Sequence, residues 1–232
     1  MTFSMIISLL VAPAIFWMGY FYYKDRFFPE PIAKTLITFF MGFIAAFLCC
    51  HFYRVLPLIG IPADPSELMG RSQGLFFLYC IGVIGVVEEI FKFLPFLLLV
   101  SRFSDFDEVV DGIIYASVIA LGFATFENIY YLPLLQGWHL LGRALASPLV
   151  HTVFSSIWGY WVARALLFRK SLVPVSLTWL SVSAFSHGLF DFLTWNPSLR
   201  LLSAVLILLV WIWRIVIIEK HNQEGSVSSQ VR

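Results

Sequence analysis

Apolar residues follow one another along the chain in long stretches that are separated by short polar connections. A helix needs about 20 apolar residues to cross the hydrocarbon core of a membrane, and each stretch has about that length. The predicted spans cover residues 3–23, 35–56, 75–100, 109–132, 144–168, 173–194 and 199–218. The pattern therefore predicts an all-α fold, a polytopic transmembrane helix bundle of about seven spans in a single domain over residues 1–220.

The connections between these spans are too short for a separate soluble domain. The longest polar stretch, 57–74, is rich in proline and glycine, which predicts a loop with a short surface helix. The tail 221–232 is polar, and we expect it to be disordered.

Lysine and arginine residues predict the orientation, because they are enriched in cytoplasmic loops. With the N-terminus outside, ten of them lie on the cytoplasmic side, four lie outside, and Lys92 lies within the membrane. We therefore expect an outside N-terminus and a cytoplasmic C-terminus. No basic residue precedes the first apolar stretch, which favours a membrane span over a cleavable signal.

The composition agrees with a membrane protein. Hydrophobic residues make up 60% of the chain and charged residues 12%, whereas a soluble domain has about 45–50% and about 25%. The net charge of +1 gives no reason to expect a nucleic-acid partner. The lipid bilayer is the expected surrounding, and the oligomeric state is left open.

Charged residues interrupt the third predicted span at Glu88, Glu89 and Lys92. A charge at membrane depth costs about 2.5–3.5 kcal/mol on insertion scales, and such residues usually serve a function. Residues four apart share a helix face, so Glu88 and Lys92 are stacked while Glu89 points about 100° away.

Other polar residues fall at similar depth in three further spans, namely Glu127, Asn128, His151, His187 and Asp191. Because successive spans alternate in direction, these positions form overlapping layers from the middle of the membrane to its outer third. Asp111 falls at the opposite end and is not expected to join them. The pattern predicts one polar chamber that water reaches from outside.

The side chains in this chamber suit hydrolysis by an activated water. Two carboxylates held together in a low dielectric cannot both ionise easily, and such a group can pass a proton from water to a leaving amine. A histidine could stabilise an oxyanion, and Asp191, one turn from His187, could fix that histidine's tautomer. A serine nucleophile beside a histidine is a weaker alternative, since the candidates Ser147, Ser155 and Ser183 lie in no known nucleophile motif.

Three motifs in this order resemble those of the PrsW family of intramembrane proteases. They are Glu88-Glu89-x-x-Lys92, Phe123-x-x-x-Glu127-Asn128 and His187-x-x-x-Asp191. The resemblance covers roughly residues 85–192, and it places the catalytic core at 75–194. It also relates the chain to the wider group of Abi and CAAX proteases and the APH-1 subunit of gamma-secretase.

The resemblance implies a peptidase of the bacterial cytoplasmic membrane that cuts a single-span membrane protein, such as an anti-sigma factor, near the extracytoplasmic side. The expected catalytic residues are Glu88, Glu89, Glu127, His151 and His187, with Lys92, Asp191 and Asn128 in support. The glutamate-type mechanism needs no cofactor.

Three alternatives stay open beside this hypothesis. One is a zinc-dependent hydrolase whose metal is held by His151, His187 and Glu127. Another is a proton-coupled transporter, since buried Glu, His and Asp also mark ion pathways. The third is a non-catalytic scaffold like APH-1.

Overall fold

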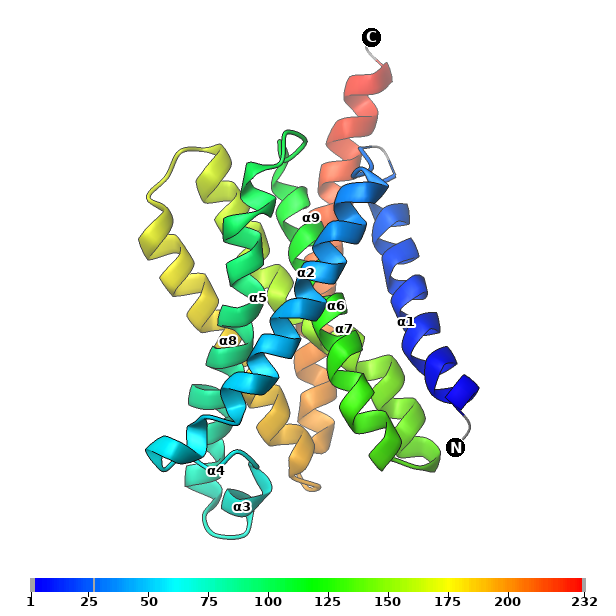
Figure 1. Ribbon diagram of the computed structural model, residues 1–232. Helices are drawn as coiled ribbons and strands as arrows, with labels where there is room; N and C mark the ends of the chain where they lie inside the picture. Colours follow the sequence, from blue (N-terminus) through cyan, green and yellow to red (C-terminus); the bar gives the residue numbers. More distant parts are fainter. Residues whose placement is uncertain (1–2, 27, 231–232) are drawn as a thin grey trace.

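The computed structural model describes residues 3–26 and 28–230, and these residues form the bundle of helices in Figure 1. Six helices in this part of the chain are long and apolar enough to cross a membrane. They are α1 (Phe3–Lys24), α2 (Ile32–Tyr53), α6 (Val109–Tyr131), α7 (Gly137–Leu167), α8 (Leu172–Trp195) and α9 (Arg200–Gln230). The prediction of an all-α membrane bundle is confirmed.

The third predicted span is a helical segment made of three consecutive pieces. These are α4 (Gln73–Tyr79), the π-helical turn η2 (Cys80–Gly85) and α5 (Val86–Leu98). A π-turn is wider than an α-turn, and it occurs often at functional sites. Because α5 alone is short, the total of seven spans and the orientation of the termini stay predictions.

The two ends of the bundle carry different connections (Figure 1). The N-terminal face carries the start of α1, the short helices η1 (Leu56–Ile59) and α3 (Ser66–Met69), and η4 (Leu132–Leu134). The C-terminal face carries the α1–α2 and α7–α8 connections and η3 (Val100–Arg102). The short helix α3 confirms the expectation for the 57–74 loop.

Helix α6 forms the centre of the bundle, because all of its residues from 110 to 124 are buried. It packs against α7 where two glycines meet: a methyl group on Gly112 would lie 2.3 Å from the carbonyl oxygen of Gly159. Small residues allow membrane helices to approach this closely. The contact holds α7 in a fixed position beside the helices that carry the carboxylates.

Two helix ends differ from the prediction. Helix α7 begins at Gly137, whereas the predicted span began at 144. The polar side chains of His139 and Arg143 lower the hydropathy of this turn but do not end the helix. Helix α9 continues to Gln230, into the segment that we expected to be disordered. Extending an existing helix costs far less than starting one. Residues 231 and 232 lie outside the described part.

Candidate active site

The first turn of α5 carries Glu88 and Glu89, and the segment before it brings them against α8. A methyl group on Gly85 would lie 2.1 Å from the carbonyl oxygen of Ala184, and one on Gly188 would lie 2.2 Å from that of Cys80. Backbones can approach this closely only where a glycine without a side chain faces the neighbouring backbone. The two carboxylates therefore face His187, which lies on the same turn of α8.

Glu89 is fully buried and is surrounded by hydrogen-bond donors. Its Oε2 accepts from Ser155 Oγ at 2.8 Å, Trp158 Nε1 at 2.8 Å and Ser183 Oγ at 3.2 Å. Its Oε1 accepts from Lys92 Nζ at 2.8 Å and lies 2.9 Å from His187 Nδ1. With this many partners Glu89 is suited to holding neighbouring groups in place, not to accepting a proton from water.

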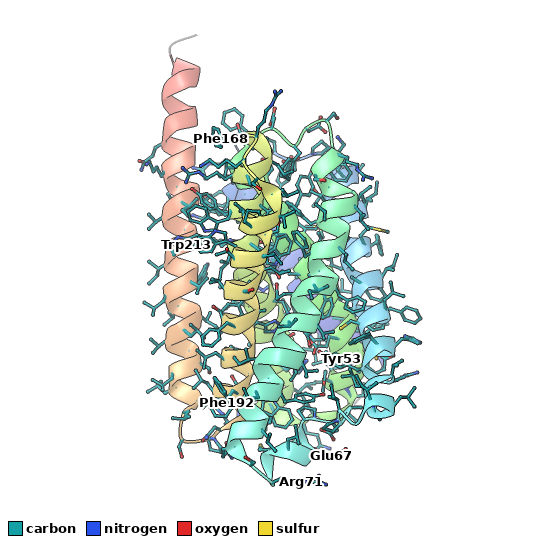
Figure 2. All side chains as sticks on the ribbon, turned by 90° about the vertical axis from the view of Figure 1, so that its left-hand side faces the viewer. Tyr53, Glu67, Arg71, Phe168, Phe192 and Trp213 are labelled. Carbon is teal, nitrogen blue, oxygen red and sulfur yellow. The ribbon has the colours of Figure 1, made fainter. Side chains whose placement is uncertain are left out.

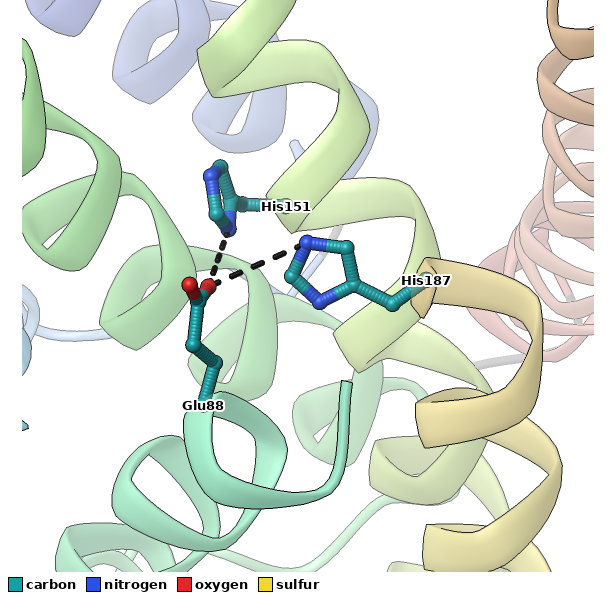
Figure 3. Close-up of side chains that lie close together, drawn as sticks. All are labelled: Glu88, His151 and His187. Atoms are coloured by element: carbon teal, nitrogen blue, oxygen red, sulfur yellow. Dashed lines mark ion pairs between the residues drawn. The ribbon is translucent and has the colours of Figure 1, made fainter. Parts of the chain in front are cut away.

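Glu88 is buried as well, but one of its oxygens accepts no hydrogen bond in the described part of the chain. Oε2 has no hydrogen-bond partner among the described residues. This oxygen lies 3.8 Å from His151 Nδ1 and 3.8 Å from His187 Nε2, as the dashed lines in Figure 3 show. Tyr53 from α2 donates to the other oxygen at 3.4 Å. Of the two adjacent glutamates, Glu88 is therefore the one with an oxygen available for chemistry.

Both histidines are oriented by a carboxylate on their far side. His151 Nε2 lies 2.9 Å from Glu127 Oε2, and His187 Nδ1 lies 2.9 Å from Glu89 Oε1. A carboxylate accepts the N–H of a neutral imidazole, which leaves the other ring nitrogen without a proton. Both unprotonated nitrogens then point toward Glu88.

Asp191 has a different position from the one its spacing suggested. Its Oδ2 lies 3.9 Å from His187 Nε2, on the side of the free nitrogen. Since Glu89 already holds the Nδ1 side, Glu89 is the carboxylate that orients His187, and the hypothesis of that role for Asp191 does not fit this geometry. Asp191 instead lies beside the space shared by Glu88 and the two histidines.

Lys92 lies among the acidic groups as their buried counter-ion. Its Nζ lies 2.8 Å from Glu89 Oε1, 3.5 Å from Glu88 Oε2 and 2.9 Å from His151 Nδ1. The ammonium also lies 4.6 Å from the ring centre of Phe123. This position agrees with a partner that neutralises charge.

Three ligand atoms converge in a way that suits a divalent metal ion. One atom each from Glu88, His151 and His187 lies within 4.8 Å of the other two. Two histidines with a carboxylate form a known zinc ligand set, and the free Oε2 of Glu88 would gain a partner. We expected Glu127 to be the carboxylate ligand, but it lies behind His151, at the ring nitrogen that faces away from Glu88. Glu88 is the carboxylate that lies close to both histidines.

The charges of the cluster also favour a cation. The cluster contains four acidic residues and two basic ones. The acidic residues are Glu88, Glu89, Glu127 and Asp191, and the basic ones are Lys92 and Arg143. When all six are ionised and the histidines are neutral, two negative charges have no positive partner. Unmatched buried charge is very costly. A divalent cation would remove that imbalance, although Lys92 Nζ would have to release His151 Nδ1.

Exposure increases from the centre of the cluster toward the N-terminal face. Glu89 and Lys92 are fully buried, whereas the side chains of Glu127 and Asp191 are each 22% exposed. Arg143, which pairs with Glu127 Oε1 at 3.1 Å, lies further along the same direction on α7. Water therefore approaches the cluster from the N-terminal face.

Some contacts in the site were missed by sequence reasoning. Tyr53 and Arg143 sit at predicted span ends, where polar groups are common, and Trp158 carries no charge that would distinguish it within the predicted span 144–168. Ser155 and Ser183 donate to Glu89, which disfavours a serine nucleophile. Asn128 is buried, but its Oδ1 has no hydrogen-bond partner among the described residues, so that oxygen does not join the network.

Comparison with known proteins supports a protease. The sequence model of PrsW family intramembrane metalloproteases matches residues 30–218. "Protease PrsW" of Bacillus subtilis is 33% identical over 192 residues, which cover 81% of this chain and 82% of that protein. The protein of the same name from Oceanobacillus iheyensis is 30% identical over 225 residues, covering 96% and 99% of the two chains. No solved structure was found to match.

Proposed function

The chain belongs to the PrsW family of intramembrane metalloproteases, and we propose that it hydrolyses a peptide bond of a single-span membrane protein at the cluster around Glu88. The substrate class is the one that the motifs imply, an anti-sigma factor or a protein of similar topology. The partial exposure of Glu127 and Asp191 supports cleavage in the half of the membrane near the N-terminal face, and the positive-inside rule predicts that this face lies outside the cell.

The observation that carries the proposal is the free oxygen of Glu88 opposite two histidine nitrogens (Figure 3). A divalent metal ion, held by Glu88, His151 and His187, would supply Lewis acidity to the scissile carbonyl. Glu89 and Glu127 fix the histidine tautomers. Asp191 Oδ2 takes a proton from the attacking water and returns it to the leaving nitrogen. The hydroxyl of Tyr53, which donates to Glu88 Oε1 at 3.4 Å, would turn its hydrogen bond to the oxyanion during the reaction.

A metal-free mechanism is the second candidate, and the position of Lys92 favours it. Its ammonium already lies within hydrogen-bond distance of His151 Nδ1 and 3.5 Å from Glu88 Oε2. In this version Lys92 supplies the positive charge, and Glu88 accepts the proton of the attacking water and returns it to the leaving nitrogen.

Cleavage of a single-span substrate in liposomes tests the function, and metal analysis separates the two mechanisms. The metal-dependent version predicts about one bound zinc or similar ion per chain and loss of cleavage after chelation. The metal-free version predicts chelator-resistant cleavage by protein without bound metal. If Glu88→Ala, His151→Ala and His187→Ala all cleave like the parent, both versions fail.

A further inference from the structure

A groove of about 260 Å³ lies between α7, α8 and α9, apart from the candidate active site. Its lining consists of Ile157, Trp161, Trp179, Leu209, Val210 and Trp213. Trp161 follows His151 by ten residues on α7, which places it about 15 Å closer to the C-terminal face. The groove is therefore separate from the chemistry of Glu88.

Three of the six residues that line this groove are tryptophans. The rings of Trp161 and Trp179 are stacked, with centroids 4.3 Å apart and planes 5° from parallel. Trp213 of α9 is in edge contact with Tyr160 at 5.9 Å. Figure 2 shows Trp213 on the side of α9 toward the rest of the bundle. Indole rings are enriched where a membrane meets water, so they mark this depth of the bilayer.

Three basic residues lie between the groove and the C-terminal face. The guanidinium of Arg164 lies 5.6 Å from the ring centre of Trp161, and Arg169 and Lys170 follow in the exposed α7–α8 turn. Asp191 is the one acidic residue between 137 and 199, and it lies near the opposite face. The side of the rim that α7 and α8 form is consequently positive.

The backbone at Arg169 gives independent support for a role of its side chain. Arg169 has φ of +50°, a left-handed conformation that glycine adopts without strain and other residues rarely adopt. The turn is a regular helix end, in which Lys170 N donates to Ala165 O at 2.8 Å. An arginine at this position keeps a charge where glycine would relieve the strain.

We propose that the groove binds one acyl chain of an anionic phospholipid, whose phosphate is held by Arg164, Arg169 and Lys170. An apolar groove below a positive rim matches an amphiphile with a negative head group. A second helix, about 10 Å wide, is too large for this space. Arginine pairs with phosphate through two parallel hydrogen bonds, and basic clusters beside a membrane attract anionic lipids.

Tryptophan fluorescence tests the proposal, because bromine atoms on an acyl chain quench nearby indoles. The protein is reconstituted in phosphatidylcholine vesicles that contain a fixed small fraction of brominated phosphatidylglycerol or, in a parallel sample, brominated phosphatidylcholine. We expect stronger quenching by the glycerol lipid. Trp179→Phe should remove much of this difference, whereas Trp138→Phe on the N-terminal face should retain it. Equal quenching by the two lipids in the parent protein would overturn the proposal.

Variants of the basic residues identify the head-group site. Arg164→Gln should weaken phosphatidylglycerol binding about fivefold, while Arg102→Gln, an exposed arginine on the same face, should leave it unchanged. Arg169→Gly removes a charge and also relieves backbone strain, so it should raise the apparent Tm and still weaken binding about fivefold. An equal loss in Arg102→Gln, or unchanged binding in Arg169→Gly, contradicts the assignment.

Discussion

At the scale of single residues, two adjacent glutamates have opposite surroundings. Glu89 is enclosed by donors from α5, α7 and α8, whereas Glu88 keeps a free oxygen. Their isosteric variants should therefore fail in different ways, since the first carboxylate mainly supports structure and the second lies at the reaction centre.

Glu89→Gln should lower stability strongly, because its amide NH₂ group would face donors and Lys92 would lose the closer of its two carboxylate partners. Breaking a buried ion pair costs about 3–5 kcal/mol, which should appear as a marked fall in apparent Tm in detergent. Glu88→Gln should keep a Tm near that of the parent and lose activity by about 10²–10⁴-fold. Equal Tm values for the two variants would contradict this division.

Arg143 is expected to act on the reaction through Glu127 and His151. Its Nη2 pairs with Glu127 Oε1. The other oxygen of the same carboxylate, Oε2, orients His151. Arg143→Gln should lower kcat by about 10–100-fold, the usual effect of losing a partner behind a metal ligand, with little change in KM. Arg143→Lys should restore part of kcat. A change in KM alone would indicate that Arg143 contacts the substrate instead.

At the scale of elements, the π-turn η2 and its contact with α8 determine where α5 presents its carboxylates. Gly85→Ala would place a methyl group 2.1 Å from the carbonyl oxygen of Ala184 and push α8 away. His187 would then move away from Glu89 and lose the contact between its Nδ1 and Glu89 Oε1. Gly82 is the matched control on the same turn, since a methyl group there meets nothing within 4 Å.

We expect Gly85→Ala to lower both the apparent Tm and the cleavage rate, while Gly82→Ala leaves both near the parent values. Gly82→Ala tests whether alanine in this turn is harmful by itself. Similar losses in the two variants would mean that the glycines serve backbone flexibility and not the close approach of η2 to α8.

The same π-turn explains which part of the site the sequence could predict. Depth along a helix follows from residue number. The sequence therefore predicted the common depth of four residues, namely Glu88, Glu127, His151 and His187. The direction of a side chain around the helix axis depends on every preceding turn, and the wide turn at Cys80–Gly85 changes it. The choice between Glu88 and Glu89, and the position of Asp191, therefore required the structure.

At the scale of the whole molecule, hydropathy predicted the helices well wherever polar residues coincide with the helix ends. It failed at the start of α7, where Arg143 belongs to the site and lies on a helix that begins earlier. Hydropathy measures preference for lipid and not helix formation, so a functional charge near a helix end shortens the predicted span. Close packing through Gly112 and Gly159 leaves no sign in hydropathy either.

Stability should depend on pH through two carboxyls in the α1–α2 connection. Burial raises the pKa of Asp25 and of Glu30 to about 8, from ordinary values of 3.8 and 4.5. The folded state keeps these protons up to about pH 8, whereas the unfolded state loses them near pH 4. Their contribution to stability is therefore complete below about pH 4 and falls as the pH rises to 8.

Asp25→Asn should remove part of this dependence. The variant should match the parent in apparent Tm at low pH and exceed it at pH values above about 8, because the amide is neutral throughout. Asp107→Asn, an exposed aspartate on the same face, serves as the control. Thermal unfolding of both variants across this pH range provides the measurement, and parallel curves for Asp25→Asn and the parent would contradict the prediction.

The position of Lys92 has a consequence for biosynthesis. Glu89 receives its other partners from Ser155, Trp158, Ser183 and His187, which the ribosome adds 66 to 98 residues later. Lys92 lies three and four residues from the two glutamates and reaches both within the same helix. The lysine thus lowers the cost of transferring this segment from the translocon into lipid before α7 and α8 exist, and a chain without it should arrest at that stage of insertion.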